Sequence, residues 1–336
     1  MRIGLNPNKD TSIKSSGYLH QVIIPVYIPN HEGYFKDSFE VFKLCIESLL
    51  KTIHGRTFIT IVNNGSSQVV QEYLGALFDA KVIQELIHTE NIGKLNAILK
   101  GLVGNNIELV TISDADVLFL PNWQQETIKV FSKAPKAGVV GLVPQFKMFE
   151  AHCGNVIYDN LFNSKLKFLP VKNPKGLEMF YDSIGWKRNY NQDYLKYSLG
   201  LELSKGLSVL VGSGHFVATY KKDMFSEITS YLGFKLGGIS EAYLDKTPLA
   251  KGYWRLTTQD NFAYHMGNTV EDWMVVPYKK EQFDEDINSN FRTNKKSNKI
   301  MFFFKNRLFV KFISIPFFYK IFLKWKSLPK EMIDRY

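Results

Sequence analysis

The sequence predicts an α/β fold in which helices flank a mixed, mostly parallel central sheet. Short runs rich in β-branched residues alternate along the chain with longer segments whose apolar residues recur at the helical period. Such alternation is typical of crossover units that join parallel strands. The chain has 336 residues, 45% of them hydrophobic and 22% charged, which suits a globular protein with one large or two smaller domains.

Most of the expected elements precede residue 146. After a polar leader that ends near residue 20, we expect strands at 21–28, 57–62, 81–87, 109–112 and 137–143, and helices at 38–53, 68–78, 95–102 and 121–131. Pro25 fits only the end of its strand or an edge strand, because proline cannot donate a ladder hydrogen bond. Pro121 suits the first turn of its helix.

Two carboxylates, Asp114 and Asp116, directly follow the strand at 109–112. In extended backbone, residues two apart face the same way, so both side chains could converge on one target. Two like charges beside an apolar core repel each other unless a cation or a donor-rich ligand neutralises them. Mg²⁺ or Mn²⁺ carrying diphosphate oxygens would neutralise both. A solvated turn that ends the strand is the alternative.

Polar groups also follow the other strands of the predicted sheet. They lie at 25–27, at Asn63 and Asn64, at 91–94 and at 114–116. Ligands of parallel sheets bind beyond the carboxyl ends of the strands, so one nucleotide could contact all four groups. The chain contains neither G-x-G-x-x-G nor G-x-x-x-x-G-K-[ST], which argues against the dinucleotide-binding and P-loop classes of phosphate site.

Four motifs, in this order, resemble the donor half of family 2 glycosyltransferases of the GT-A fold. They are V-I-I-P-V-Y (22–27), I-V-N-N-G-S-S (61–67), E-N-I-G-K-L-N-A (90–97) and S-D-A-D-V-L-F-L-P-N-W (113–123). The resemblance extends over about residues 20–270 and is strongest from 20 to 145. It implies a nucleotide-sugar donor, above all a UDP-sugar, a divalent metal ion (Mn²⁺ or Mg²⁺), and transfer with inversion at the sugar carbon.

The resemblance also implies roles for individual residues. Pro25 and Tyr27 would border the base, and Asn64 would reach it. Asp114 would hold the ribose, and Asp116 would bind the metal. The family often has Asp in the turn where this chain has Asn at two positions, which leaves the base specificity open. The donor-binding set that the resemblance implies is Pro25, Val26, Tyr27, Asn63, Asn64, Lys94, Asp114, Ala115 and Asp116.

The expected catalytic residues lie in the second half of the chain. Residues 237–245 resemble a family segment that usually reads E-D-x-D-L, whose central acid is the general base. Alignment on Leu244 gives that role to Glu241, with Asp245 as the alternative, because two of the three acids are missing; either could instead be a surface carboxylate. His265 ends a short aromatic strand, and the resemblance implies that it completes the metal shell with Asp116. A structural histidine is the alternative.

Residues 151–206 show no clear periodicity and are rich in aromatic side chains. We expect an acceptor-binding insertion here, because aromatic faces stack on sugar rings, with an ordinary loop-rich surface as the alternative. The following strand, at 207–220, is broken at 212–214, where the backbone could approach a ligand closely. The aromatic residues of the insertion are Tyr158, Tyr181, Trp186, Tyr190, Tyr194 and Tyr197.

The net charge of +10 belongs to the last fifty residues. Twelve of the 42 Lys and Arg residues but only two of the 32 acids lie at 287–336, so residues 1–286 carry 30 of each sign. We therefore expect no nucleic-acid surface on the main domain. Only Cys45 and Cys153 are present, which argues against a disulfide framework or a cysteine metal site. The first residues lack an apolar signal region, and no run of 18 uncharged apolar residues occurs, so we expect a cytoplasmic location.

Residues 300–325 interleave ten Phe, Tyr or Trp residues with basic ones, and Pro316 would divide them into two short helices. This composition is typical of an amphipathic helix that lies in the headgroup region of an anionic membrane. The alternative is a helix packed on the catalytic domain with its lysines turned outward.

These features together predict a metal-dependent inverting glycosyltransferase of the hexosyltransferase type. It would act on a glycan or lipid-linked acceptor in cell-surface polysaccharide synthesis, as a peripheral protein on the inner face of the membrane. We divide the chain into a leader (1–20), a donor half (21–145), an acceptor and catalytic half (146–286) and a basic aromatic tail (287–336). The alternatives are a sugar nucleotidyltransferase, whose G-x-G-x-R-L start is absent, and a non-catalytic membrane-surface protein that keeps the fold.

Overall fold

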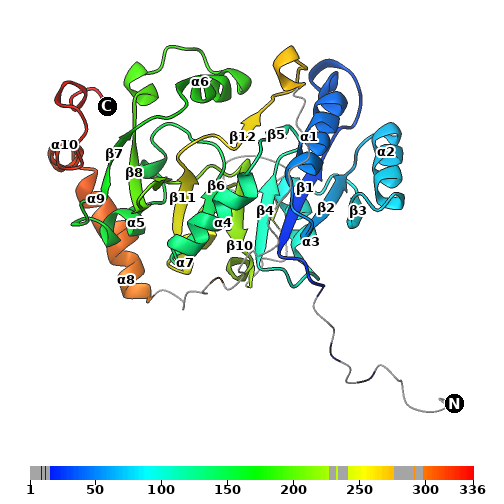
Figure 1. Cartoon of the computed structure of the whole chain (residues 1–336), viewed down its shortest axis with the longest axis horizontal. Coiled ribbons are helices and arrows are strands. Elements are labelled where there is room, and N and C mark those ends of the chain that lie inside the picture. The colour runs from blue at the N-terminus through cyan, green and yellow to red at the C-terminus, as the bar shows by residue number, and fades with distance from the viewer. Residues whose placement is uncertain are drawn as a thin grey trace.

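A ten-stranded sheet runs through the computed structural model, which describes residues 9, 12, 16–226, 232–233, 241–275, 291 and 298–336 (Figure 1). The strand order is β3-β2-β1-β4-β10-β6-β11-β9-β8-β7, and β12 pairs separately with β5. Helices cover the large sheet, so the predicted α/β class with a central sheet flanked by helices is confirmed.

The bounds of the strands are β1 His20–Val26, β2 Thr57–Asn64, β3 Glu85–Thr89, β4 Leu109–Ser113, β5 Val117–Phe119, β6 Ala137–Gly141, β7 Leu166–Pro170, β8 Tyr197–Ser204, β9 Leu207–Val211, β10 Val217–Lys221, β11 Trp254–Thr258 and β12 Ala263–His265. The helices are α1 Ser38–Thr52, α2 Gln68–Asp79, α3 Lys94–Leu102, α4 Trp123–Lys133, α5 Gly154–Asp159, α6 Pro174–Ser183, α7 Glu241–Ala250, α8 Lys299–Phe303, α9 Phe309–Ile313 and α10 Pro316–Trp325. A π-helical turn, Phe304–Leu308, joins α8 to α9.

Strand direction decides where the carboxyl ends meet. Strand β1 pairs in parallel with β2 and β4, β2 pairs in parallel with β3, and β6 pairs in parallel with β11. Strand β10 lies antiparallel between β4 and β6, and β9, β8 and β7 continue antiparallel to the far edge. The carboxyl ends of β1, β2, β4 and β6 therefore open on the same side of the sheet.

Strand β1 illustrates why the predicted strands read as unbroken apolar runs. Val22, Ile24 and Val26 are buried in the core beneath α1 and α2, whereas Ile23 is buried in the core that α3 covers. Because successive residues of a strand face opposite sides, a strand covered on both faces needs apolar residues at every position.

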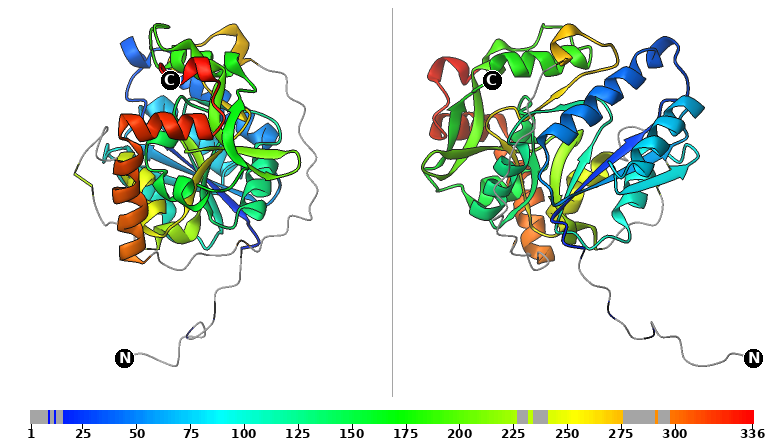
Figure 2. Two further views of the ribbon diagram at one scale, coloured as in Figure 1. Left: turned by 90° about the vertical axis from the view of Figure 1, so that its left-hand side faces the viewer. Right: turned by 45° about the vertical axis from the view of Figure 1, so that its right-hand side comes forward.

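The C-terminal helices complete a further core. In Figure 2 they run along the outside of the sheet's β7 end, in orange and red. Phe322, Leu323, Leu328, Met332 and Tyr336 are buried there against α4, α5, β7 and β8. The tail therefore packs on the domain along one side. Within the described part of the chain, no helix has the length and apolarity needed to span a membrane.

Several expected bounds were wrong for local backbone reasons. Strand β3 starts at Glu85, because the turn after α2 places Lys81 in the left-handed region with φ of 59°. Helix α4 starts at Trp123, since Asn122 before it has φ of 66°, so Pro121 precedes the helix instead of opening it. The segment 151–206, for which no periodicity was evident, contains α5, β7, α6 and β8.

The segment at 114–116 also departs from expectation. Ala115 and Asp116 form a turn between β4 and β5, so the extended backbone assumed for the two carboxylates was wrong. Asp114 and Asp116 have different partners, Lys94 and His265, although both line the same cavity.

A buried polar network ties β1 to α4 at the amino-terminal end of the sheet. The side chain of His20 is fully buried, and its Nε2 lies 2.6 Å from Thr111 Oγ1. Gln124 Nε2 donates to His20 Nδ1 (3.1 Å) and to Thr57 Oγ1 (3.0 Å). Because Nδ1 accepts, the neutral tautomer with hydrogen on Nε2 satisfies every partner, and a second proton would face a donor. Burial, helped by nearby His54, holds the pKa of His20 well below its usual value.

We predict that this network makes the protein acid-labile. Burial also lowers the pKa of His54, to about 4, with Arg56 adding to the shift. Both folded-state pKa values lie below the unfolded value of about 6.5, so the stabilisation is complete above that pH and is lost as pH falls. Each histidine should steepen the fall in unfolding free energy by about 1.4 kcal/mol per pH unit. Urea unfolding from pH 7.5 to 4.5 measures the slope. The unfolding free energy of His20→Gln should fall less steeply with decreasing pH than that of the parent, and equal slopes would contradict the prediction.

Candidate active site

A cavity of about 450 Å³ opens at the carboxyl ends of β1, β2 and β4. Eight of the predicted donor-binding residues line it: Pro25, Val26, Tyr27, Asn64, Lys94, Asp114, Ala115 and Asp116. Asn91, from the segment 91–94 that we expected at the third strand exit, also lines it, and the remaining lining residues, which we did not predict, are Ile28, Tyr34, Phe35, Ser38, Val41, Gly267 and Asn268. One cavity thus brings together the groups that follow four separate strands, β1 to β4.

The unpredicted residues come from the start of α1 and from loops that meet only in the folded chain. Tyr34 and Phe35 belong to a 3-10 turn, Gly33–Phe35, and the ring of Tyr27 packs edge-on against Phe35 at 5.8 Å. Asn268 Nδ2 donates to the carbonyl of Tyr34 across 3.0 Å and closes the rim. The adjacent aromatic residues Tyr34 and Phe35, in the segment between β1 and α1, were the local signal that could have predicted this wall.

Asn63 and Asn64 have different roles, although they are neighbours. Asn64 lines the cavity, and its Oδ1 accepts from the backbone nitrogen of Ile92 across 3.0 Å, which fixes the loop before α3. Asn63 is buried away from the cavity, where Oδ1 accepts from Ser66 N and Nδ2 lies 2.9 Å from His88 Nδ1. Gly65 follows with φ of 91°, and a Cβ there would lie 2.9 Å from Asn91 N.

Asp114 is held by a backbone hydrogen bond to the neighbouring strand and by an ion pair. Its backbone nitrogen donates to the carbonyl of Phe216 across 2.7 Å, which joins the end of β4 to the start of β10. Its carboxylate oxygens lie 2.6 Å and 2.7 Å from Lys94 Nζ. Lys94 is the first residue of α3, so the helix that follows β3 carries a positive charge to the exit of β4.

Asp116 faces His265 across 3.4 Å between Oδ2 and Nε2. Strand β12 sets this distance, since it pairs with β5, and Met266 N donates to the carbonyl of Asp116. The other oxygen, Oδ1, is buried and has no hydrogen-bond partner. Burial raises the pKa of the Asp116 carboxyl, although nearby His265 opposes that rise. A buried carboxylate oxygen without a donor is costly, so this position fits a cation.

The tautomer of His265 supports the same conclusion. Ser183 Oγ donates to the carbonyl of Phe180 (2.6 Å) and lies 2.9 Å from His265 Nδ1. With its hydrogen committed to Phe180, the hydroxyl accepts from Nδ1, and Nε2 keeps its lone pair toward Asp116. Two electron-rich atoms then face each other, an arrangement that a divalent cation between them would stabilise.

The protein alone offers few ligands for such an ion. Within the described residues, no group of three or more His, Cys, Asp or Glu side chains is arranged to hold a metal. Asp116 and His265 would therefore supply two ligands, and phosphate oxygens and water the rest. Mg²⁺ commonly binds in this way, through one or two carboxylates plus substrate phosphates.

The two candidates for general base lie on α7. Glu241 is the first residue of that helix, and its side chain lies outside the described part of the structure. Asp245, one turn later, lies 2.5 Å from the guanidinium of Arg255 and 3.7 Å from His215 Nδ1. Burial alone would raise the pKa of Asp245, but the hydrogen bond from His215 and the charge of Arg255 hold it below its usual range.

The aromatic side chains of residues 151–206 mainly pack against other aromatic rings. Tyr181 is buried, stacks on Phe146 at 4.0 Å, and accepts a hydrogen bond from the backbone nitrogen of Phe146. Trp186 is different, because it is 55% exposed and lies 4.9 Å from Tyr181, three residues after the serine that contacts His265. Tyr158 is also exposed, but it packs beside Phe309 of the tail.

A comparison with known families settles what kind of protein carries this site. The family described as Glycosyl transferase family 2 matches residues 22–193. The chain belongs to this family. The match includes all four motifs of the donor half, so the resemblance read from those motifs is confirmed.

Solved glycosyltransferase structures are similar at low sequence identity. TarS 1-349 from S. aureus shares 12% identity with a TM-score of 0.42, over 74% of this chain and 60% of that one. The mannosyltransferase PcManGT from Pyrobaculum calidifontis, solved with GDP-Man and Mn²⁺, shares 14% sequence identity with a TM-score of 0.44, over 76% of this chain and 59% of that one. GalNAc-T7, solved with UDP, GalNAc and Mn²⁺, shares 13% sequence identity with a TM-score of 0.46, over 75% of this chain and 44% of that one. This family 2 chain thus spans 60% or less of each of these proteins. No curated protein matches it by sequence.

We predict that substitutions on α7 separate the two base candidates of this family 2 protein. Asp245→Asn leaves Arg255, which is 4% exposed, without its carboxylate and should cost about 3 kcal/mol of unfolding free energy. Glu241→Gln should reduce turnover by about 10²–10⁴-fold without comparable destabilisation. Urea unfolding and initial rates measured on the same preparations test both. A stable Asp245→Asn protein with the larger loss of turnover would transfer the base role to Asp245.

Proposed function

We propose that this protein is a metal-dependent glycosyltransferase that moves a sugar from a nucleotide-sugar donor to a glycan or a lipid-linked acceptor. One observation carries the proposal. Asp116, with an unpartnered buried oxygen, faces the lone pair of His265 in a cavity that Asp114 and Lys94 also line. A nucleoside diphosphate bound with a divalent ion would supply the positive charge that these two electron-rich atoms face.

The rest of the cavity suits the nucleoside, with a UDP-sugar as our first choice of donor. Tyr27 is 41% exposed, and with Phe35 it offers an aromatic wall against which a base can pack. Asp114 accepts hydrogen bonds and can receive them from ribose hydroxyls. Lys94 balances the charge of Asp114 and adds a cation near the phosphates.

The reaction follows from these positions. A divalent ion at Asp116 and His265 would neutralise charge that develops on the departing diphosphate. We assign Glu241 as the general base that takes the proton of the acceptor hydroxyl. The hydroxyl oxygen bonds to the anomeric carbon as the bond from that carbon to the diphosphate oxygen breaks, and one such displacement inverts the carbon. Asp245, paired with Arg255, anchors α7 one turn after Glu241.

The division into a donor half (21–145), an acceptor half (146–286) and a tail (287–336) forms part of this proposal. In the acceptor half, Trp186 is the best-placed aromatic platform for a sugar ring, because it is exposed and follows the Ser183–His265 contact closely in the chain.

We further propose that the tail docks the enzyme on the inner face of an anionic membrane, where cell-surface glycans are assembled. Exposed apolar and basic side chains alternate on the outward side of the C-terminal helices, which we name the tail face. Phe317, the most exposed apolar residue of the tail face, is 67% exposed. The tail face comprises Ile300, Phe303, Phe304, Leu308, Phe312, Ile315, Phe317, Ile321 and Trp325 with Arg307, Lys311, Lys320 and Lys324.

Both alternatives for the tail find support, because its helices have two sides. The inward side chains of Phe322 and Leu323 are buried in the domain, whereas Phe317, Ile321 and Trp325 on the same helix are exposed. An exposed apolar surface of this extent with interleaved cations matches the composition of interfacial helices.

We predict that Asp116→Ala abolishes Mn²⁺-dependent release of UDP from UDP-sugars. The expected loss is about 10²–10³-fold or more, since metal stabilisation of a transition state contributes several kcal/mol. Initial rates over a panel of UDP-, GDP- and dTDP-sugars with Mn²⁺ measure it. Asp79→Ala, which removes an exposed carboxylate at the end of α2, is the matched control and should be neutral. Full activity of the parent in EDTA would rule out the metal.

We also predict that the parent protein sediments with vesicles of phosphatidylglycerol and phosphatidylcholine, less so at high salt, because screening acts over about 8 Å at physiological ionic strength. Replacing Phe317, Ile321 or Trp325 by Ser should weaken binding by roughly tenfold each, given about 1.5–3 kcal/mol per buried large apolar side chain. Point changes are preferable to truncation, because the tail also supplies buried core residues. Val103→Ser, at a residue 62% exposed after α3, is the control. Failure of the parent to bind at low salt would make the tail purely structural.

A further inference from the structure

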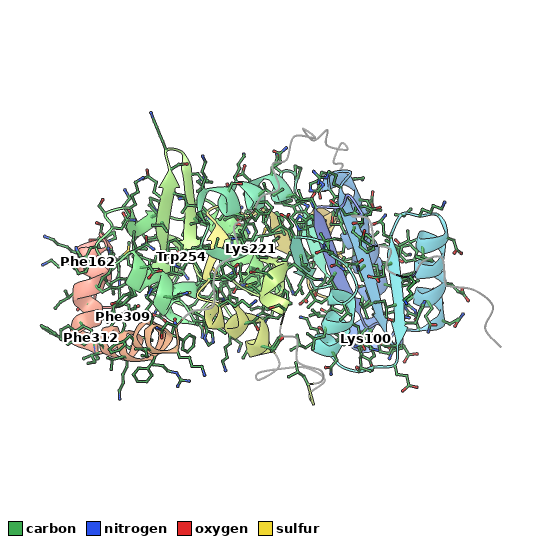
Figure 3. All side chains as sticks on the ribbon, turned by 90° about the horizontal axis from the view of Figure 1, so that it is seen from below. Lys100, Phe162, Lys221, Trp254, Phe309 and Phe312 are labelled. Carbon is green, nitrogen blue, oxygen red and sulfur yellow. The ribbon has the colours of Figure 1, made fainter. Side chains whose placement is uncertain are left out.

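A second cavity, of about 300 Å³, lies between the tail helices and the domain, apart from the donor site. Apolar side chains make most of its wall: Phe149 and Ile157 from the domain, and Phe309, Val310, Ile313 and Phe322 from the tail. Phe309 and Phe312 lie with Phe162 at one end of the molecule in Figure 3, whereas Lys100 lies at the other. The volume is at the lower limit of ordinary ligand pockets.

The polar groups of this cavity already have partners. The Glu150 carboxylate accepts a hydrogen bond from Tyr319 Oη across 2.5 Å and forms an ion pair with Lys147 at 2.6 Å. The interior is therefore left with apolar surface. A cavity lined by apolar groups does not hold water well, but it binds apolar molecules.

Contacts on both sides fix the helices at this spacing. On one side, a Cβ on Gly154 would collide with Val310, so the glycine allows α9 to approach α5 closely, and Asn155 N donates to Asn306 Oδ1 across 3.1 Å. On the other side, Leu323 is buried, and Lys326 Nζ donates to the carbonyl of Leu161 across 2.6 Å. With both sides anchored, the tail cannot close the cavity without breaking these contacts.

The cavity reaches the tail face at the corner between α9 and α10. Ser314 lines the cavity and is itself exposed. Its neighbour Ile315 is 46% exposed and belongs to the tail face. A chain that leaves a bilayer beneath the tail face could therefore enter the cavity at this corner.

We propose that the cavity takes up one hydrocarbon chain of an anionic membrane lipid. The inference rests on the proposed docking of the tail face for the source of the lipid. Charge complementarity selects an anionic lipid, since Arg307, Lys311 and Lys324 lie exposed on the same helices and can hold a phosphate headgroup while the chain occupies the apolar wall. Lys320 already forms an ion pair with Asp334.

The first test needs no membrane and no sugar donor. Titration with cis-parinaric acid, an anionic fluorescent fatty acid, should give binding of one molecule per protein. Ile313→Trp and Ile157→Phe each place a larger side chain in the cavity and should weaken that binding at least tenfold. Val103→Ser, at an exposed residue outside both the cavity lining and the tail face, should bind the acid as the parent does. Melting temperatures confirm that each variant is folded, and two fillings from different walls guard against failure of one. No binding by the parent, or equal binding by both filled variants, would overturn the inference.

The second test identifies the source of the chain. Vesicles that carry phosphatidylglycerol with a mid-chain diazirine should label Phe149, Ile157 or Phe322 of the parent, and Ile313→Trp should reduce this labelling tenfold while sedimentation changes less than twofold. Labelling confined to exposed residues of the tail face would overturn uptake from the membrane. A parent that binds cis-parinaric acid but not vesicles would refute membrane docking, and with it the lipid source, while leaving the donor site and the proposed transfer reaction untouched.

Discussion

The hydrogen bond from Asp114 N to the carbonyl of Phe216 is the contact on which the arrangement of the site depends. It closes the β4–β10 pair at the point where the chain leaves the sheet. On one side of it, the turn carries Asp116 toward β12 and His265. On the other side, it brings His215, which precedes Phe216, to Asp245 on α7. The proposed metal ligands and the anchor of the helix that carries the proposed base are thus positioned from one backbone contact between strands that are far apart in the sequence.

The donor half was predictable because its strands are covered on both faces and each ends in polar residues. Parallel pairing then placed 25–27, Asn64, Lys94 and 114–116 around one cavity. Asn63 could not join them, since neighbouring residues of a strand face opposite sides and Asn64 already faces the cavity. The rim formed by Tyr34 and Asn268 joins segments more than two hundred residues apart and leaves no local pattern.

The second half was less predictable for physical reasons that differ between its parts. Strands β7 and β8 pair antiparallel at the sheet edge and are only partly buried, so their apolar pattern is weak. From the sequence we expected the tail either to pack on the domain or to contact a membrane. In the folded chain, one side of α10 packs on the domain and the other side is exposed. The packed and the exposed side chains differ only in their burial along those helices, and burial is known only once the chain is folded.

The packing of residues 328–336 into the core beside β7 and β8 has a consequence for synthesis of the protein. Leu328, Met332 and Tyr336 bury against residues such as Phe168 and Leu199, which leave the ribosome far earlier. The core around Phe168 and Leu199 therefore stays incomplete, with apolar surface exposed, until residues 328–336 have been synthesised, and aggregation can compete during that interval. A chain cut before residue 328 would keep every candidate site residue and still lack part of this core, so its unfolded fraction and its degradation should rise.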